Sequence, residues 1–259
     1  MPRVDLPGKK FRWRFLAAIA ASLFAALAAN ALLQQIQASQ PSHIPSNISW
    51  TDQTLKTVSA GNALRGLLLA KRCEHCHGAE GFSQSPVTPN LAAMDKFAIW
   101  KQMEDFRDRK RSSLVMQPIA ASLNGRDYAD LAVYYSMFPA YPDPQDDRSF
   151  PQKLPESAEI TTAARLIKSG DGLRGIPPCQ ACHGPVAYRM GAPSLTMQNS
   201  DYIFAQLQAF AAGTRANDVN MPMRTIAGLL TADERRALAG YYGSGSALLP
   251  GQADGSQPR

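Results

Sequence analysis

All four cysteines of this 259-residue chain lie in two copies of one short pattern. The first copy is Cys73-Glu74-His75-Cys76-His77 and the second is Cys179-Gln180-Ala181-Cys182-His183. C-x-x-C-H is the attachment signature of a c-type haem, in which two cysteine sulfurs bond to the haem edge and the histidine binds the iron. The doublet predicts two covalently bound haem c groups on Cys73, Cys76, Cys179 and Cys182, with His77 and His183 as iron ligands.

A single copy of this pattern would also suit half of a zinc site or a redox-active cysteine pair. Two observations favour haem. Both cysteine pairs carry a histidine at the same place, and the sequence has no third pair of cysteines to complete a zinc site.

A haem iron that carries electrons needs a second axial ligand, and a methionine thioether is the usual one. Met116 and Met223 correspond between the two halves of the chain, and each lies three residues before the Ile of an Ile-Ala pair. They are the predicted second axial ligands. Methionine is also a common core filler, and Met221 competes with Met223 in the second half.

Pro89 and Pro193 follow the two motifs at similar distances. Each proline either simply forms a turn in its loop or lies next to the haem and supports its iron ligand. In the second interpretation, a nearby backbone carbonyl accepts the proton of the iron-binding imidazole and orients its ring.

The repeat extends well beyond the motifs. Cys73 recurs as Cys179 at an offset of 106 residues, Gln102 and Phe106 recur at 104, and Met116 through Tyr135 recur at 107. Each half is predicted to contain a helix, the C-x-x-C-H motif, a loop, a helix, a methionine loop and a final helix. Asn124 and Thr231 stand where the final helices should be capped, and Thr231 with Glu234 predicts a capping box.

The remaining segments divide the chain. Residues 1–33 combine a basic leader with the uncharged stretch 15–33, which predicts either a cleaved signal peptide or a membrane anchor. We expect a spacer at 34–53, a first domain at 54–138, a proline-rich linker at 139–156, a second domain at 157–245 and a disordered tail at 246–259. A helix is expected from Leu55 to Lys71, leading into the first motif.

The basic balance of the chain comes mostly from its leader. Lys and Arg number 27 against 21 Asp and Glu, but residues 1–33 hold five of the bases and one of the acids. The rest carries a charge of about +2, with no aromatic and basic stripe, so a nucleic-acid partner is excluded. The basic cluster from Arg107 to Arg111 is either a solvated face or a surface that docks an acidic partner.

The chain resembles the dihaem cytochrome c4 family, which has two class I cytochrome c domains in tandem. The likeness covers about residues 60–245 and is stronger in the second half, with Gly175-Ile176-Pro177-Pro178 before Cys179 and with Gln206 and Phe210. Ala164 departs from it, because it stands where the family usually has glycine, as Gly66 does in the first half. The resemblance implies an all-α fold, His77/Met116 and His183/Met223 ligation, and haems that meet near the domain interface.

We therefore expect a non-enzymatic electron carrier outside the cytoplasm, periplasmic or tethered to the inner membrane. It would pass single electrons between a respiratory donor, such as a quinol-oxidising cytochrome complex or a dehydrogenase, and a terminal oxidase. The alternatives are a dihaem oxidoreductase, such as a peroxidase or a thiosulfate dehydrogenase-like enzyme, and the haem subunit of a larger redox complex.

Overall fold

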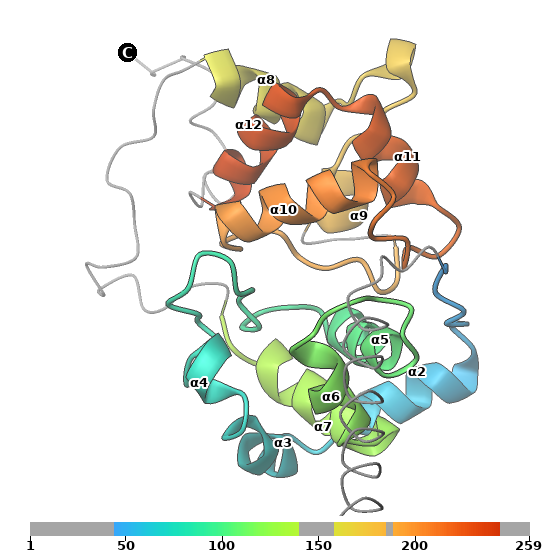
Figure 1. Cartoon of the computed structure of the whole chain (residues 1–259), viewed down its shortest axis with the longest axis vertical. Coiled ribbons are helices and arrows are strands. Elements are labelled where there is room, and N and C mark those ends of the chain that lie inside the picture. Colours follow the sequence, from blue (N-terminus) through green and yellow to red (C-terminus); the bar gives the residue numbers. More distant parts are fainter. Residues whose placement is uncertain (1–43, 140–157, 185–188, 244–259) are drawn as a thin grey trace, which may run out of the picture. The chain divides into compact units, whose positions relative to one another are not determined.

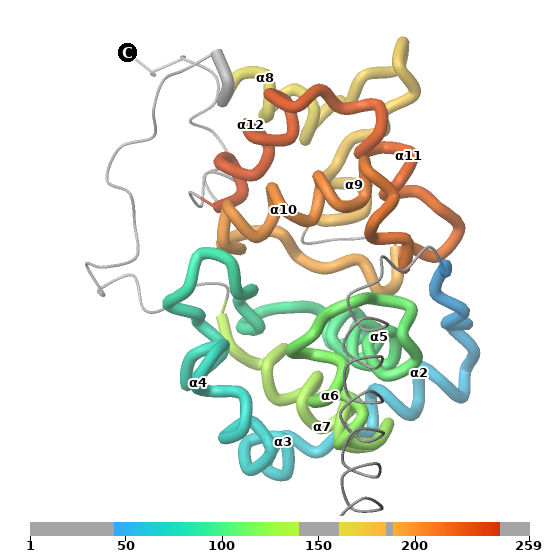
Figure 2. Tube along the Cα trace, in the orientation of Figure 1, coloured from blue at the N-terminus to red at the C-terminus, as the bar shows by residue number. Residues whose placement is uncertain are grey.

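The computed structural model describes residues 44–139, 158–184 and 189–243, and the structural statements below concern these ranges. Within them the regular elements are α-helices and one short 3₁₀ helix, and an isolated bridge pairs Asp171 with Ile176. The all-α prediction is confirmed. Figures 1 and 2 show one group of helices in blue to light green and a second group in yellow to red. We call these the first half (44–139) and the second half (158–184 and 189–243).

The first half is built around its last helix. Its elements are α2 (Asp52–Ser59), α3 (Ala63–Ala70), α4 (Glu74–His77), α5 (Lys96–Arg107), α6 (Met116–Ala121) and α7 (Gly125–Ser136). Helices α2, α3 and α5 all pack on α7. The core between them contains Val58, Trp100, Tyr128 and Tyr135, all almost fully buried.

The second half repeats this plan. Its elements are α8 (Ala158–Lys168), the 3₁₀ helix η1 (Gly172–Arg174), α9 (Gln180–His183), α10 (Ser200–Ala211), α11 (Pro222–Leu229) and α12 (Ala232–Gly243). Helix α12 packs against α8 and α10, and α10 also contacts α11. Leu166, Ile176, Ile203 and Tyr242 belong to its buried core.

Both final helices begin as predicted. The Asn124 side chain accepts hydrogen bonds from the backbone N–H groups of Arg126 and Asp127, and the Asp127 carboxylate accepts one from the Asn124 N–H. At α12, the Glu234 N–H donates to Thr231 Oγ1 at 3.2 Å and the Thr231 N–H donates to Glu234 Oε2 at 2.9 Å. These reciprocal bonds satisfy N–H groups that a helix start leaves unpaired.

The expected helix from Leu55 to Lys71 is two helices instead, because the chain turns at residues 60–62. A Cβ atom on Gly61 would lie 2.2 Å from the carbonyl oxygen of Ala129, so the chain passes too close to α7 for a side chain. Asn62 then starts a new helix, since its side chain accepts from the Arg65 N–H at 2.9 Å and its own N–H donates to Asp130 at 2.6 Å.

Several predicted segments lie outside the described residues, namely 1–33, most of the linker 139–156 and the tail 246–259. Of the expected spacer 34–53, residues 44–53 are described. There the Ser46 hydroxyl donates to Asp105 at 2.7 Å, and the Trp50 ring lies 5.8 Å from that of Phe97. Among the described helices, none has both the length and the hydropathy to cross a bilayer.

The described residues form one compact unit, and hydrogen bonds join its two halves. The Tyr202 N–H donates to the Pro86 carbonyl at 3.1 Å, and the Asn199 side chain donates to the Ser85 carbonyl at 3.0 Å. The Lys101 ammonium donates to the carbonyl of Asn217 at 2.7 Å. We call the region where the first and second halves contact each other the junction.

Candidate haem sites

Each C-x-x-C-H motif folds into a single helical turn. In the first, the N–H groups of Cys76 and His77 both donate to the Cys73 carbonyl, at 3.2 and 2.9 Å. In the second, Cys182 and His183 donate to Cys179 in the same way, at 3.2 and 3.0 Å. One turn of helix therefore holds both cysteines and the histidine of each motif together.

The two histidines meet the carbonyl groups of the two prolines that the sequence singled out. His77 Nδ1 lies 2.9 Å from the Pro89 oxygen, and His183 Nδ1 lies 2.8 Å from the Pro193 oxygen. Because a carbonyl oxygen only accepts, Nδ1 must carry the proton and donate it. This bond sets the tautomer that leaves the Nε2 lone pair available to a metal.

Burial favours the neutral form of both imidazoles. It lowers the pKa of His77 and of His183 below the usual histidine range, although the bond to the proline carbonyl acts in the opposite direction. A neutral imidazole is the form that binds iron.

The four cysteines form no disulfides with one another, so all four sulfurs are available to bond to haem. Burial raises the pKa of the Cys179 thiol to about 11 and also raises that of Cys73. Within the described ranges, no three or more His, Cys, Asp or Glu side chains cluster in a way that would hold a metal ion.

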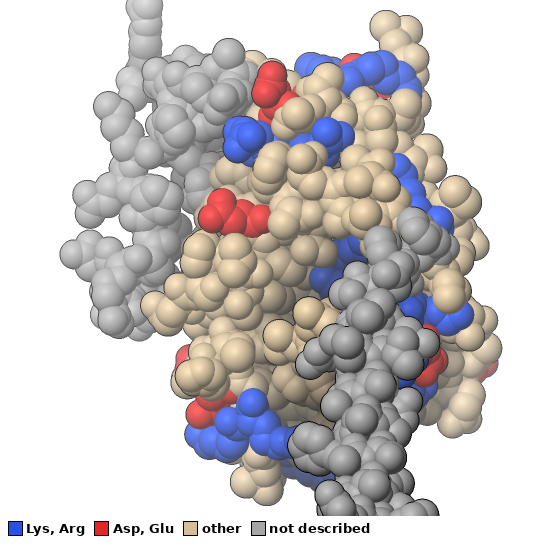
Figure 3. Space-filling view, in the orientation of Figure 1, with Lys and Arg blue, Asp and Glu red and all other residues tan. Residues whose placement is uncertain are grey.

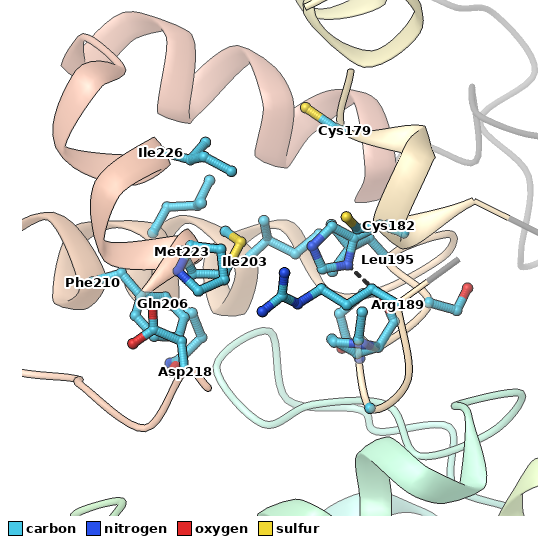
Figure 4. A pocket seen from close by; sticks show the side chains of 18 of the residues that line it. Cys179, Cys182, Arg189, Leu195, Ile203, Gln206, Phe210, Asp218, Met223 and Ile226 are labelled. Atoms are coloured by element: carbon cyan, nitrogen blue, oxygen red, sulfur yellow. Dashed lines mark hydrogen bonds between the residues drawn. The ribbon is translucent and has the colours of Figure 1, made fainter. Parts of the chain in front are cut away.

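In the second half, a cavity brings Cys179, Cys182, His183 and Met223 together. Figure 4 shows Met223 and Ile226 of α11 on the opposite side of this cavity from Cys179 and Cys182. Leu195, Ile203 and other apolar side chains form much of the wall between them.

The competing methionine of the second half lies elsewhere. Met221 is 52% exposed and is not among the residues that line the cavity. Its backbone adopts the left-handed conformation, with φ of 65°, at the position before α11 begins. This turn separates Met221 from Met223 although only one residue stands between them.

In the first half, Met116 is the first residue of α6, and its N–H donates to Ser113 Oγ at 3.1 Å. Its side chain is partly buried against the first core, as are those of Cys73 and Leu91.

Two buried tyrosine hydroxyls provide evidence on whether these sites can hold a haem. Tyr135 and Tyr242 correspond between the halves, and the hydroxyl of each is buried with no hydrogen-bond partner among the described residues. Burial raises the pKa of both phenols, so both stay protonated donors. Tyr242 lines the cavity, whose wall is mostly apolar with a few polar groups, which suits a large flat apolar cofactor with polar edges.

A group of polar residues at the junction was not predicted from the sequence. Lys101, Gln102 and Arg111 of the first half border the cavity of the second half, where Arg215 and Asn217 also lie. The signal that could have found them is the offset of 104 residues, which Arg111 and Arg215 share with Gln102 and Gln206.

The basic cluster that was considered as a docking surface is divided. Arg107 pairs with Glu104 and Asp108, and the Arg111 guanidinium turns into the junction. On the face drawn in Figure 3, Lys and Arg side chains are spread over several elements, with Asp and Glu among them. The described part of that face shows no continuous basic surface.

Comparison with known proteins gives a consistent result. No model of a protein family matches the sequence. Cytochrome c4 of Pseudomonas aeruginosa is 31% identical over 187 residues, which cover 71% of this chain and 88% of that protein. A thiosulfate dehydrogenase electron acceptor of Stutzerimonas stutzeri is 39% identical over 67% of this chain and 78% of its own length.

Solved structures agree. The reduced recombinant cytochrome c4 of Pseudomonas stutzeri superposes with a TM-score of 0.61 at 29% identity, over 71% of this chain and 99% of that one. A thiosulfate dehydrogenase of Marichromatium purpuratum gives a TM-score of 0.59 at 31% identity, over 73% of this chain and 41% of that one. The chain belongs to the cytochrome c4 family, electron carriers with tandem class I cytochrome c domains and two covalently bound haem c groups.

Proposed function

We propose that this protein is a periplasmic carrier of single electrons, with His77 and Met116 as the axial ligands of the first iron and His183 and Met223 as those of the second. Cys73, Cys76, Cys179 and Cys182 hold the haems through thioether bonds. The bound haem supplies the one-electron chemistry, while the chain binds it, orients its ligands and excludes water.

The observation that carries the proposal is the cavity of the second half. His183 and Met223 come from different helices, α9 and α11, and line the same cavity with both cysteines of the motif. The His183 ring is held by Pro193, so its Nε2 is the free nitrogen. Repetition extends the assignment to the first half, where His77 is held by Pro89 in the same way and Met116 begins the corresponding helix.

Ligation by two protein side chains separates a carrier from an enzyme. An iron with histidine on one side and methionine on the other leaves a substrate no place to bind until the methionine is displaced. This argues against the peroxidase alternative and against direct oxidation of thiosulfate by this chain.

The relatives suggest the class of electron donor. Two of them, from Stutzerimonas stutzeri and Thiomonas intermedia, are named thiosulfate dehydrogenase electron acceptors. We favour a thiosulfate-oxidising dehydrogenase or a quinol-oxidising cytochrome complex as the donor, and a terminal oxidase as the acceptor. The thiosulfate dehydrogenase structure also favours a second candidate, because this chain resembles less than half of that longer protein: a haem subunit that works within a complex.

The export signal supports a periplasmic location. Residues 1–33 combine basic residues with an uncharged apolar stretch, which directs the following chain out of the cytoplasm. These residues lie outside the described ranges. N-terminal sequencing of the mature protein distinguishes a cleaved signal peptide from a membrane anchor.

Rapid-mixing spectroscopy of the purified holoprotein tests the proposal. Thiosulfate alone should leave the haems oxidised, and a catalytic amount of a thiosulfate dehydrogenase should reduce both of them. Membranes that contain a terminal oxidase should then reoxidise them, at a rate that falls as salt rises because charged docking surfaces are screened. Fast turnover of thiosulfate or peroxide by the isolated protein would overturn the carrier assignment.

A further inference from the structure

Arg111 and Arg215 are a matched pair of arginines at the junction, one from each half. They correspond at the same offset of 104 residues as Gln102 and Gln206. Each guanidinium lies over a phenylalanine of its own half, Arg111 at 4.7 Å from the Phe106 centroid and Arg215 at 4.4 Å from that of Phe210. The repeat has therefore placed two equivalent cations on either side of the junction.

The two guanidinium groups share the same acceptors. Arg111 donates to Gln102 at 2.7 Å within its own half and to Gln206 at 3.0 Å across the junction. Arg215 donates to Gln206 at 2.7 Å within its own half and to Gln102 at 3.1 Å across the junction. Arg111 also donates to the Tyr202 hydroxyl at 2.8 Å. Neutral amide oxygens therefore hold both cations close to each other.

Positive charge exceeds negative charge at this place. Lys101 adds a third cation, which is buried, whereas Arg111 and Arg215 are partly buried. The carboxylate that faces the group is Asp105, which Lys101 already holds at 2.5 Å. Asp218 is engaged by Arg224 at 2.7 Å. Among the ion pairs of the described residues, neither Arg111 nor Arg215 has a carboxylate partner.

Burial and this excess of positive charge together shift the pKa of two residues in the group, Arg215 and Tyr202. Burial and the charge of Arg111 lower the pKa of Arg215 to about 9. Burial acts to raise the pKa of Tyr202, but the two arginines outweigh it and the pKa is lowered. Asp105 and Asp218 lie near Arg215, but Lys101 and Arg224 already pair with them, so the group of cations can accept a further anion that is not a protein side chain.

The cavity shows where such a group lies. Arg111, Arg215 and Lys101 border the same cavity as His183, Met223 and both cysteines of the second motif, and Figure 4 shows Gln206 and Phe210 beside it. A haem carries two carboxylates on its propionate side chains, and planar guanidinium groups bind carboxylates through paired hydrogen bonds.

We propose that Arg111 and Arg215 together bind a propionate carboxylate of the haem in the second half, so that the first half supplies a charged residue to the second haem site. This inference rests on the haem ligation proposed above. The expected consequence is a change in the reduction potential of the second haem. A cation near the iron favours its reduced state, so Arg111 raises the reduction potential of the second haem from the other half of the chain.

Reduction potentials of the two-haem protein test this. Arg111→Gln removes the charge and keeps an amide that can hydrogen-bond. Arg236→Gln is the matched control, because the Arg236 guanidinium lies over Phe204 at 4.6 Å but Arg236 is exposed and does not line the cavity. The potential that changes in Met223→Ala identifies the second haem.

We expect Arg111→Gln to lower the equilibrium constant for reduction of the second haem about three- to tenfold relative to the control. A tenfold change corresponds to a reduction potential lower by about 59 mV for one electron. The first haem should shift less, and the low-spin spectrum should persist. A shift of the second potential no larger than in Arg236→Gln would overturn the inference. Absence of two low-spin haems from the unaltered protein would contradict the proposed function instead.

A second measurement covers the case in which Arg111→Gln fails to load haem. Arg111→Lys keeps the charge but loses the paired donors, so it is the milder change. Redox difference infrared spectra with ¹³C-labelled haem propionates should show displaced carboxylate bands in Arg111→Lys and unchanged bands in Arg236→Lys. Identical bands in both variants would contradict the contact.

Discussion

Asn90 and Gln198 hydrogen-bond to each other in both directions across the junction. The Asn90 N–H donates to Gln198 Oε1 at 2.8 Å, and Gln198 Nε2 donates to the Asn90 carbonyl at 2.9 Å. Asn90 directly follows Pro89, whose carbonyl holds the His77 ring. The second half thus braces the loop that orients the histidine of the first half.

Replacing Gln198 with Ala should destabilise the protein by about 1–3 kcal/mol, because two partly buried backbone groups of Asn90 lose their partners. Gln208→Ala is the control, since Gln208 lies on the same part of the chain but is exposed. Chemical denaturation of the holoprotein measures the difference. The first haem's potential should also shift, because the Pro89 loop is released. Equal stabilities of the two variants would show that the junction does not depend on this pair.

The residues nearest the chemistry were the most predictable from sequence. A C-x-x-C-H motif is a local pattern that folds as one turn, so its cysteines and histidine are placed by their spacing alone. The helix caps at Asn124 and Thr231 are equally local and were found as expected. The repeat extended these local predictions to the order of helices in each half.

Features that depend on distant contacts were not predictable. The break at Gly61 arises because α7 passes so close. Gly61 and Asn62 are residue types that often end and begin helices, but residues 55–71 alone do not show the approach of α7. From the sequence, Arg111 was interpreted as one of four basic residues on a surface. In the structure its guanidinium points into the junction and contacts Tyr202 of the second half. The position of Met221 outside the cavity depends on its left-handed backbone conformation, which its side chain does not suggest.

Gly66→Ala should destabilise the first half by about 1–3 kcal/mol, because an added Cβ would lie 2.2 Å from the Asp130 carbonyl oxygen and force α3 away from α7. Gly240→Ala, in α12, is the matched control. A Cβ there meets nothing within 4 Å, so helix propensity should stabilise that variant by up to about 1 kcal/mol. Thermal unfolding of both holoproteins checks the opposite signs. Loss of stability in Gly240→Ala would contradict the packing described here.

Asp105→Ala should cost about 3–5 kcal/mol, because it leaves the buried Lys101 ammonium without its carboxylate. Asp105 is 1% exposed and also accepts hydrogen bonds from Ser46 and Asn217, at 2.7 Å each. Asp108→Ala removes a surface ion pair with Arg107 and should cost less than about 1 kcal/mol. Urea titration at neutral pH distinguishes them, and similar midpoints would mean that Lys101 finds another partner.

Replacing Met223 with Ala should make the second haem high-spin or give it a substitute ligand and lower its reduction potential, since the thioether that favours reduced iron is gone. The first haem should stay nearly unchanged, because its proposed ligands come from other helices. Met221→Ala is a close control, being two residues away and exposed outside the cavity, and it should leave both spectra as they were. Absorption spectra and potentiometric titration of the two variants decide the assignment. If Met221→Ala removed the low-spin signal and Met223→Ala kept it, Met221 would be the ligand, and α11 would have to begin differently in the protein that carries haem.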